Sequence, residues 1–403
     1  MTRREARVLI VAGEASGDLY GGLLMRAMAA ATPGAIEFVG VGGPAMRAAG
    51  LRPLGDAGAL GVTGLIEVLG RLATIWRAYR EARAALAGGG RRPDLTILID
   101  YPDFNLRLAR HAKRAGIPVL YFVSPQVWAW RKGRVGPIAR RVDRMLVILP
   151  FEEKLYRAAG VPVEFVGHPL LDLVHAGRTR GQALPPLGLD PLRPTLALLP
   201  GSRGNEIATH LPPMVGAAAL LANEFRDLQV MIPVAPTVGL EEMRRSVRRA
   251  GGETLRPVLV LEDRYDAVAA CDAAVVASGT ATLETALLGV PMVIVYRMNP
   301  LTYALARAVS EVPHIGMANL IAGERVVPEL VQRECTAERI AAELRRILTD
   351  PVAAAAIRRK LAGVRARLGR TGAIERVARA AWSMIGGPAS GTLETEVAGE
   401  DRA

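Results

Sequence analysis

Short apolar runs alternate with longer segments of helical periodicity through the first half of the chain. The runs are too short for buried helices, and they lack the polar alternation of strands that face water on one side. Strands of this kind, joined by helices, form a parallel sheet with helices on both faces. The predicted strands lie at residues 8–12, 36–41, 95–99, 119–122, 145–149 and 163–166.

The same pattern restarts in the second half, after a segment that is rich in Pro and Gly and predicts a linker. We therefore predict two doubly wound α/β domains, residues 1–187 and 188–351, that face each other across a ligand cleft. The residues that mark the linker are Gly181, Pro185, Pro186, Gly188 and Pro191. The predicted strands of the second domain lie at residues 195–199, 230–234, 258–261, 273–277 and 292–295.

The end of the chain predicts a further helical stretch and a tail. Residues 352–386 have a helical pattern that is interrupted near Gly369 and Gly372. We expect this stretch to leave the second domain and pack back on the first. Residues 387–403 are rich in Gly, Ser, Thr and acidic residues, which predicts a disordered tail.

The charge balance indicates an anionic partner. Lys and Arg number 51 against 39 Asp and Glu, a formal net charge of +12, which fits phosphorylated substrates, acidic lipid or nucleic acid. The two cysteines, Cys271 and Cys335, are too few for a disulfide framework or a zinc site, so a reducing cytosol is expected. No apolar run approaches the ~20 residues of a membrane span, and Glu14 and Asp18 rule out a signal peptide.

One turn predicts a nucleotide site. The apolar run 273–277 leads through Ser278, Gly279 and Thr280 into a helix that Gly289 ends. The first amides of a helix bind anions, and the two hydroxyls could add to a phosphate site. Glu284 lies one helical turn further, where its carboxylate could accept hydrogen bonds from a ribose diol. A well-capped helix without a ligand is the alternative.

A second turn supplies a cation. Gly201, Ser202 and Arg203 follow the strand at residues 195–199 and precede a helix. A guanidinium beside a helix start would stabilise the charge on a departing diphosphate without a metal ion. The alternative is an arginine at a solvated helix start.

Acid–base chemistry is predicted at the end of another strand. Asp100 ends the run 95–99, and the proline-containing turn Tyr101, Pro102, Asp103 would hold it in a partly desolvated place, where its pKa rises toward that of a general base. Asp103 is expected to cap the next helix. His168 is another candidate acid or base, although a hydrogen-bonded structural histidine is at least as common.

Three more stretches suggest contacts with substrate or membrane. The turn at residues 13–18 could receive a sugar or phosphate, or be a plain strand-to-helix turn. Residues 124–134 interleave aromatic and basic side chains, which predicts a pocket for a phosphorylated, partly apolar acceptor. Residues 65–86 form an apolar stripe flanked by arginines, which fits a helix that rests on an anionic membrane. A helix packed on the first sheet is the alternative.

With these residues in view, the chain resembles the lipid-A-disaccharide synthases, inverting glycosyltransferases of family 19 with the GT-B fold. The resemblance rests on seven stretches spread over roughly the first 350 residues, which are jointly specific. They are GEASGD, IDYPDFN, SPQVWAWR, VGHPLLD, LLPGSRGNE, SGTATLE and GVPMVIVYRMNP.

The resemblance implies a reaction and its residues. The enzyme would join UDP-2,3-diacylglucosamine to 2,3-diacylglucosamine 1-phosphate, giving a β(1→6) disaccharide and UDP in lipopolysaccharide biosynthesis. It implies Asp100 as base, Glu14 as a further active-site residue, Arg203 and the turn 278–284 as holders of UDP, and Asn319 at a position that faces the nucleotide. Residues 316–318 and Glu324 depart from the family pattern. No metal, cofactor or nucleic acid is expected, and the protein would lie on the cytoplasmic face of the inner membrane, with a homodimer as an option.

Three rival functions are weaker. A UDP-sugar 2-epimerase shares the two-domain architecture but needs no lipid-sized apolar surface. A basic RNA-binding protein would explain the charge but should show more aromatic residues. A Rossmann oxidoreductase would use Gly40, Gly42 and Gly43, which lack the full dinucleotide spacing.

Overall fold

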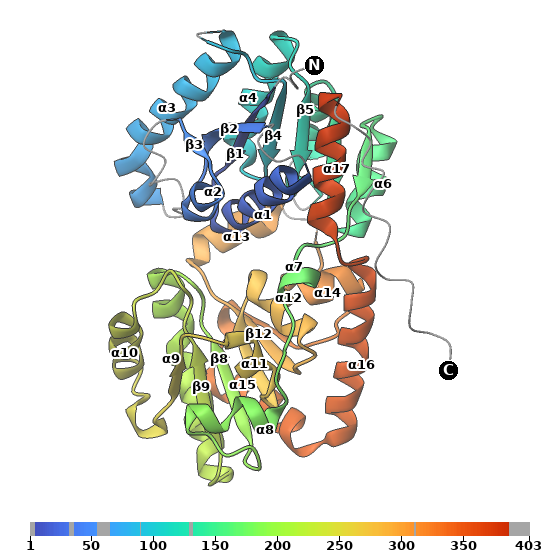
Figure 1. Cartoon of the computed structure of the whole chain (residues 1–403). Helices are drawn as coiled ribbons and strands as arrows, with labels where there is room; N and C mark the ends of the chain where they lie inside the picture. Colours follow the sequence, from blue (N-terminus) through green and yellow to red (C-terminus); the bar gives the residue numbers. More distant parts are fainter. Residues whose placement is uncertain are drawn as a thin grey trace, which may run out of the picture. The chain divides into compact units, whose positions relative to one another are not determined.

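The computed structural model describes residues 5–31, 36–54, 65–88, 90–128, 132–309 and 312–386, and of residues 65–72 it describes only the backbone. The chain forms two compact units. Unit 1 comprises the residues up to Pro169 together with those from Arg370 onward, and unit 2 comprises Leu170–Gly369. Each unit is built around one parallel sheet (Figure 1). The predicted disordered tail, residues 387–403, lies outside the described residues.

The sheet of unit 1 has, among the described residues, seven strands in the order β3-β2-β1-β4-β5-β6-β7. All neighbouring pairs are parallel, and the interior strand β1 pairs with β2 on one side and β4 on the other. Val8 to Val11 are fully buried, as expected for a strand covered on both faces. The strands are β1 Ala6–Ala12, β2 Ile36–Val41, β3 Arg52–Pro53, β4 Leu95–Ile99, β5 Val119–Phe122, β6 Arg144–Val147 and β7 Val163–Phe165.

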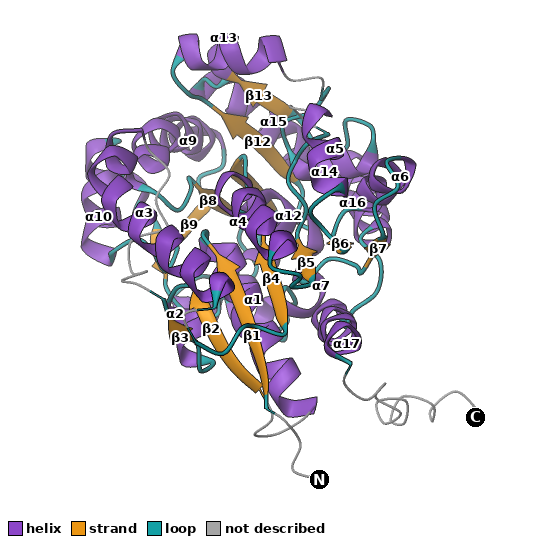
Figure 2. Ribbon diagram, turned by 90° about the horizontal axis from the view of Figure 1, so that it is seen from above, coloured by secondary structure: helices purple, strands orange, loops and turns teal. Residues whose placement is uncertain are grey.

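Helices cover both faces of this sheet (Figure 2). On one face, α3 and α4 pack their small and apolar side chains into a core with β1, β4 and β5. Elsewhere in the unit α1 packs against α17, and the Trp382 indole donates a hydrogen bond to the carbonyl of Met28 at 3.2 Å. The helices are α1 Ala15–Ala31, α2 Pro44–Ala48, α3 Leu65–Ala87, α4 Pro102–Arg114, η2 Lys132–Arg134, α5 Val135–Ala139, α6 Pro150–Ala158 and α17 Ala373–Ile385.

Unit 2 repeats the architecture with, in its described residues, six parallel strands in the order β10-β9-β8-β11-β12-β13. Its strands are β8 Thr195–Leu199, β9 Gln229–Pro233, β10 Val258–Val260, β11 Ala273–Ala277, β12 Met292–Tyr296 and β13 Glu329–Val331. Its helices are α7 Leu170–Leu173, α8 Arg180–Ala183, η3 Pro185–Leu187, α9 Gly204–Glu224, α10 Leu240–Arg249, η4 Glu253–Leu255, α11 Arg264–Ala269, α12 Thr280–Leu287, α13 Pro300–Val309, α14 Met317–Ala322, η5 Gln332–Glu334, α15 Ala337–Thr349 and α16 Pro351–Arg367.

The predicted strands are all present, and two short edge strands, β3 and β13, were not predicted. Charged residues and prolines interrupt the apolar runs at both places: Arg52 and Pro53 in β3, and Pro328 and Glu329 at the start of β13. Among the described residues, no helix is both long and apolar enough to cross a membrane.

The predicted linker is packed on unit 2, so the observed boundary lies near residue 169 rather than 187. Leu184 is fully buried, and the Arg180 guanidinium donates hydrogen bonds to the carbonyls of Pro191 (2.7 Å) and Ala270 (2.6 Å). Prolines and glycines interrupt periodicity in packed loops as they do in linkers, so the pattern does not separate the two.

The C-terminal helical stretch divides between the units. The interruption near Gly369 and Gly372 is present, but only α17 packs in unit 1. Helix α16 stays on unit 2, where it packs against α12, α14 and α15. There Arg367 donates to the carbonyl of Ile321 at 3.1 Å, near the C-terminus of α14.

Candidate active site

The strand order reverses at the same place in both sheets, between β1 and β4 in unit 1 and between β8 and β11 in unit 2. Ligands of doubly wound sheets bind beyond the carboxyl ends of the strands at such a switch point. Glu14 and Asp100 follow β1 and β4 in the first sheet. Arg203 and Ser278 lie in the loops that follow β8 and β11 in the second. The topology therefore brings the predicted residues of each unit together in pairs.

The backbone holds Asp100 in a constrained position. Its N–H donates to the carbonyl of Phe122 at 3.0 Å, and its own carbonyl accepts from the Tyr121 hydroxyl at 2.6 Å and from the Asn105 amide at 2.8 Å. Asp100 and Tyr101 have φ of 46° and 48°, a left-handed conformation that non-glycine residues rarely adopt. Such strain is typical of functional sites whose surroundings enforce it.

The surroundings of Asp100 give it the properties of a base. Burial and, secondly, the negative charge of Glu14 raise the pKa of Asp100 to about 7, and the backbone hydrogen bond from Tyr101 lowers it in part. The Tyr101 ring lies over Gly13, where an added Cβ would stand 2.3 Å from the ring. Only glycine fits there. A carboxyl with this pKa is half ionised near neutral pH, as a general base should be.

Other candidates in unit 1 have structural partners. The Asp18 carboxylate accepts hydrogen bonds from the amides of Gly43 (2.7 Å), Ala45 (2.9 Å) and Met46 (3.1 Å), so it holds the start of α2. Asp103 lies in the first turn of α4 and pairs with Arg134 at 2.5 Å. Burial lowers the pKa of His168 to about 4, which keeps its imidazole neutral at physiological pH.

The loop after β8 is closed by its own carboxylate. Glu206 accepts from the Ser202 amide at 2.9 Å and pairs with the Arg203 guanidinium at 2.7 Å. It also lies against Gly201, where a Cβ would stand 2.6 Å from a carboxylate oxygen. The loop before α9 is therefore occupied by an acidic side chain, while the Arg203 side chain is 45% exposed and accessible to an anion.

The loop after β11 is open. In the part of the chain that the structure describes, the amides of Gly279, Thr280 and Ala281 have no acceptor, and Gly279 and Thr280 are exposed. The Ser278 hydroxyl donates to the carbonyl of Ile315 at 3.1 Å, so it fixes the turn. Amides at the start of a helix that have no intrahelical acceptor are the groups that bind phosphate in many proteins.

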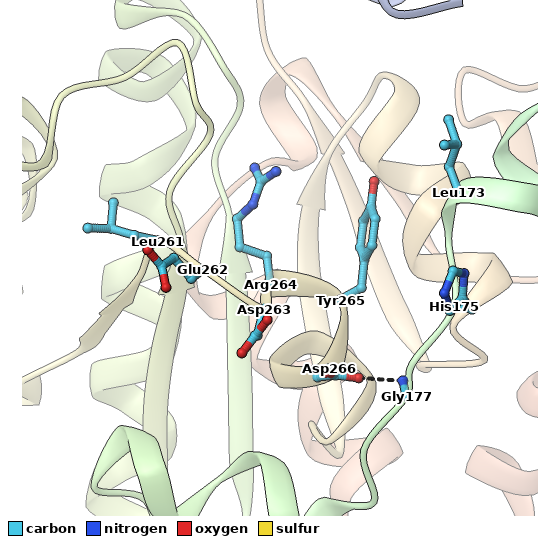
Figure 3. Close-up of a pocket in the computed structure, with 9 residues that line it drawn as sticks. All are labelled: Leu173, His175, Gly177, Leu261, Glu262, Asp263, Arg264, Tyr265 and Asp266. Carbon is cyan, nitrogen blue, oxygen red and sulfur yellow. Dashed lines mark hydrogen bonds between the residues drawn. The ribbon is translucent and has the colours of Figure 1, made fainter. Parts of the chain in front are cut away.

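Tyr265 lines a pocket of unit 2 (Figure 3). The Tyr265 hydroxyl in this pocket donates to the Glu284 carboxylate at 3.0 Å. Burial raises the pKa of Glu284, and the hydrogen bond from Tyr265 and the charge of Arg264 lower it in part. One carboxylate oxygen is thus held, which orients the group. The pocket is lined by Leu173, His175, Gly177, Leu261, Glu262, Asp263, Arg264, Tyr265 and Asp266.

Asn319 has a different place from the one that the family resemblance implies. It is fully buried, its Oδ1 accepts from the amides of Val326 and Val327, and its Nδ2 donates to the Val327 carbonyl and to Glu329. The whole side-chain amide is thus used inside unit 2, so direct contact with a nucleotide is not its role in this structure. A buried asparagine cannot be recognised from a residue match alone.

Two glutamates near the sites were missed. Glu152 is buried beneath residues 124–128, and Glu329 accepts from the amides of Ile315 and Gly316 at 3.0 Å each. Neither follows a strand in a recognisable motif. For Glu152 the signal was a glutamate at the third position after Leu149, where a capping box is common.

The predicted membrane stripe is only partly exposed. Trp76 is 59% exposed and stacks on Tyr79, whereas Ile75 and Tyr79 pack against the core of unit 1. The other predicted stripe residues, Leu65, Ile66, Val68, Leu69 and Leu72, lie outside the described side chains, as do Trp130 and Arg131 of the aromatic and basic stretch.

Comparisons with known proteins identify the family. A family model described as lipid-A-disaccharide synthetase matches residues 8–375. The lipid-A-disaccharide synthase of Geobacter metallireducens is 49% identical over 96% of this chain and 99% of its own length. That of Geobacter sulfurreducens is 48% identical over 94% of this chain and 97% of its own length.

Solved structures share the fold at low identity. A UDP-glucosyltransferase from Polygonum tinctorium has a TM-score of 0.59 at 16% identity and covers 96% of this chain and 100% of its own. A UDP-GlcNAc 2-epimerase from Neisseria meningitidis, bound to UDP-GlcNAc, has a TM-score of 0.61 at 11% identity and covers 93% and 99%. They confirm the predicted α/β architecture, which glycosyltransferases and epimerases share, so the fold does not choose between them. The sequence does: the chain belongs to the lipid-A-disaccharide synthase family, the glycosyltransferases of lipid A biosynthesis.

Proposed function

We propose that the chain transfers the diacylglucosamine of UDP-2,3-diacylglucosamine to the 6-hydroxyl of 2,3-diacylglucosamine 1-phosphate, with Asp100 as the general base. The observation that carries this proposal is a carboxyl at a switch point whose pKa is raised to about 7 by burial and by Glu14. In a single displacement the acceptor oxygen gives its proton to Asp100 and bonds to the anomeric carbon. The bond from that carbon to the diphosphate breaks, and UDP leaves with the electron pair.

Unit 2 supplies the stabilisation of the leaving group. The amides of Gly279, Thr280 and Ala281 bind the diphosphate, and Arg203 turns from Glu206 toward its charge. Glu284, oriented by Tyr265, accepts hydrogen bonds from the ribose, and the neighbouring pocket with its exposed Leu261 holds the nucleobase. The acidic lining of this pocket suits a neutral nucleobase better than a phosphate.

The test is UDP release from UDP-2,3-diacylglucosamine with and without the acyl-sugar phosphate. Release should require the acceptor, and an epimerised donor should not appear. Asp100→Asn should lower turnover by ~10²-fold or more while UDP still binds, because only the proton acceptor is removed. Turnover near that of the wild type would remove Asp100 from the mechanism.

The proposal includes no metal ion. In the described ranges, no group of three His, Cys, Asp or Glu side chains is placed to hold one. Activity should therefore survive chelation by EDTA, and Arg203→Ala should weaken both UDP binding and turnover. Activity that disappears with EDTA and returns with magnesium would overturn this part of the proposal.

The acyl chains imply contact with a membrane, and helix α3 is the proposed site. Trp76 is exposed on α3. Burial lowers the pKa of His111, and the nearby charges of Arg83, Arg114 and Arg110 lower it further, so three arginines are clustered there. An exposed aromatic residue beside clustered arginines suits an anionic lipid surface. Trp76→Ser should reduce flotation with anionic vesicles but leave activity on detergent-dispersed substrate. The control is Leu192→Ser, because Leu192 is 92% exposed in unit 2.

A further inference from the structure

One buried carboxylate holds the loop that follows β5. Glu152, on α6, is 2% exposed, and one of its oxygens accepts from both the Ser124 hydroxyl at 2.7 Å and the Trp128 indole at 3.0 Å. Its other oxygen accepts from the Leu149 amide at 3.2 Å and caps the start of α6. The two oxygens thus have separate tasks: one shapes residues 124–128 and the other serves the helix.

Further contacts from α6 reinforce the same loop. The Trp128 ring packs edge-on against Phe151, with ring centroids 5.1 Å apart. The Tyr156 hydroxyl donates to the carbonyl of Pro125 at 3.4 Å. Phe151, Glu152 and Tyr156 of α6 therefore all contact one short loop, which restrains that loop.

The loop lies beside Asp100. Strands β4 and β5 are neighbours, and the Asp100 amide donates to Phe122, the last residue of β5. The charge of Asp100 also reaches Glu152, where it adds to the burial that raises the pKa of Glu152 to about 7. Hydrogen bonds from Ser124, Trp128 and Leu149 lower that pKa in part. Glu152 is thus a carboxyl close to the proposed base without being exposed to a substrate.

A buried carboxyl is costly to stability, and an apolar side chain in its place is often as stable or more so. A cap for α6 alone does not require burial, because exposed side chains cap helices well. Burial of Glu152 is needed, in contrast, for the two hydrogen bonds that its carboxylate accepts from Ser124 and Trp128 in the loop.

We propose that Glu152 is a positioning residue for the acceptor substrate: through Ser124 and Trp128 it fixes the wall of the acceptor site next to Asp100. This inference rests on the proposed function, since it takes Asp100 as the base. Glu152 does not touch the reacting atoms. It determines where the indole of Trp128 and the backbone of residues 124–128 stand when the acceptor sugar binds.

Three substitutions separate the two tasks of Glu152. Glu152→Gln keeps an oxygen for Ser124 and Trp128 but turns an N–H toward the Leu149 amide, so it loses the helix cap. Glu152→Ala loses both. Trp128→Phe keeps a ring against Phe151 and removes only the indole donor. The matched control is Glu153→Ala, because Glu153 is the next residue on α6 and, within the described residues, its side chain pairs with Arg157 at 2.8 Å rather than with the loop.

The experiment measures kcat and the KM of each substrate for the full chain and these four variants, together with thermal unfolding. Glu152→Ala should raise the KM of the acyl-sugar phosphate about tenfold or more and leave the KM of UDP-diacylglucosamine unchanged, because small displacements of a binding wall have large effects. Trp128→Phe should raise the acceptor KM by a smaller factor. Glu152→Gln should restore the acceptor KM although it unfolds at a lower temperature than the wild type, and Glu153→Ala should match the wild type.

For Glu152→Ala, equal changes in both KM values, or a lowered unfolding temperature with an unchanged acceptor KM, would overturn the proposal. If Glu152→Ala does not fold, Ser124→Ala and Trp128→Phe decide, since each removes a single donor. The activity of the wild type distinguishes a failure of the proposed function from a failure of the role of Glu152. If the wild type does not release UDP in the presence of the acceptor, the proposed function is refuted. If the wild type is active and Glu152→Ala has an unchanged acceptor KM, only the role of Glu152 is refuted.

Discussion

Asp100 shows how far one residue depends on its neighbours. The same side chain on a free peptide has a pKa of 3.8, and burial with the nearby Glu14 raises it to about 7. The left-handed backbone at Asp100 and Tyr101 is held by Tyr121, Asn105 and Phe122. The chemistry thus depends on these surrounding groups as much as on the carboxyl itself.

Glu14 should set the pH range of the enzyme. Asp100 accepts a proton only when it is ionised, so activity should rise as pH increases through about 7. The charge of Glu14 raises the pKa of Asp100, so Glu14→Gln should move the midpoint of that rise to lower pH. The measurement is kcat/KM against pH. Asp103→Asn is the control, because Asp103 raises the pKa of Tyr101 but is not among the causes that shift Asp100. An unmoved midpoint in Glu14→Gln would contradict this account.

Asn319 should act on the nucleotide through other residues. It donates to Glu329, Glu329 accepts from the Ile315 amide, and the Ile315 carbonyl accepts from Ser278 in the phosphate turn. Asn319→Asp keeps the shape of the side chain but places a carboxylate against Glu329 and the Val327 carbonyl. It should weaken UDP binding about tenfold, because it loosens this chain of hydrogen bonds to Ser278. Calorimetric titration with UDP measures this.

The control for that substitution is Thr285→Val, since the buried Thr285 hydroxyl makes no hydrogen bond with the described part of the chain and its loss should leave UDP affinity intact. Unchanged UDP affinity in a destabilised Asn319→Asp variant would show that the chain of hydrogen bonds is only structural.

At the scale of elements, the two strand-to-helix turns of unit 2 differ in what occupies them. Glu206 accepts from the Ser202 amide in the loop before α9, whereas among the described residues nothing accepts from the amides of Gly279, Thr280 and Ala281 at the start of α12. Both turns follow a strand, and the sequence of each predicts a phosphate site. The position of one carboxylate in the loop distinguishes them.

Thr280→Pro should test the α12 turn directly. Proline is well tolerated as the first residue of a helix, and it removes one amide donor without breaking α12. UDP affinity should fall about tenfold, the usual effect of losing a hydrogen bond to a charged group. Thr280→Val is the control, since it lacks the hydroxyl and keeps the amide. If the two variants bind UDP equally well, the amide of residue 280 does not bind the diphosphate.

At the scale of the whole molecule, the chain returns to its first unit after completing the second. Helix α17 packs against α1, and Arg376 donates to the carbonyl of Val166 at 2.9 Å. The last helix therefore belongs to the fold of unit 1 although more than 200 residues separate it from β7 in sequence.

Trp382→Ala should unfold unit 1 selectively. Trp382 is 8% exposed, and removing a buried tryptophan side chain typically costs ~3–5 kcal/mol. Calorimetric unfolding should show the transition of unit 1 at a lower temperature, while UDP affinity, which we propose for unit 2, stays unchanged. Loss of UDP affinity in this variant would show that unit 2 depends on α17.

The sequence by itself determined the α/β class, nearly every strand, the two turns of unit 2 and Asp100 as the base candidate. Apolar runs and glycine turns are local, and a strand end marks a site wherever it lies in space. The seven motifs also determined the family, because their joint order is specific.

Only the tertiary structure decided the rest. It put the unit boundary near residue 169, divided α16 from α17, buried Asn319, and brought Glu152 beneath Ser124 and Trp128. These features depend on contacts between residues 7 to more than 200 positions apart. Glycines, prolines and buried polar residues have the same local pattern whether they are free or partnered, so only the packing of the folded chain reveals their partners.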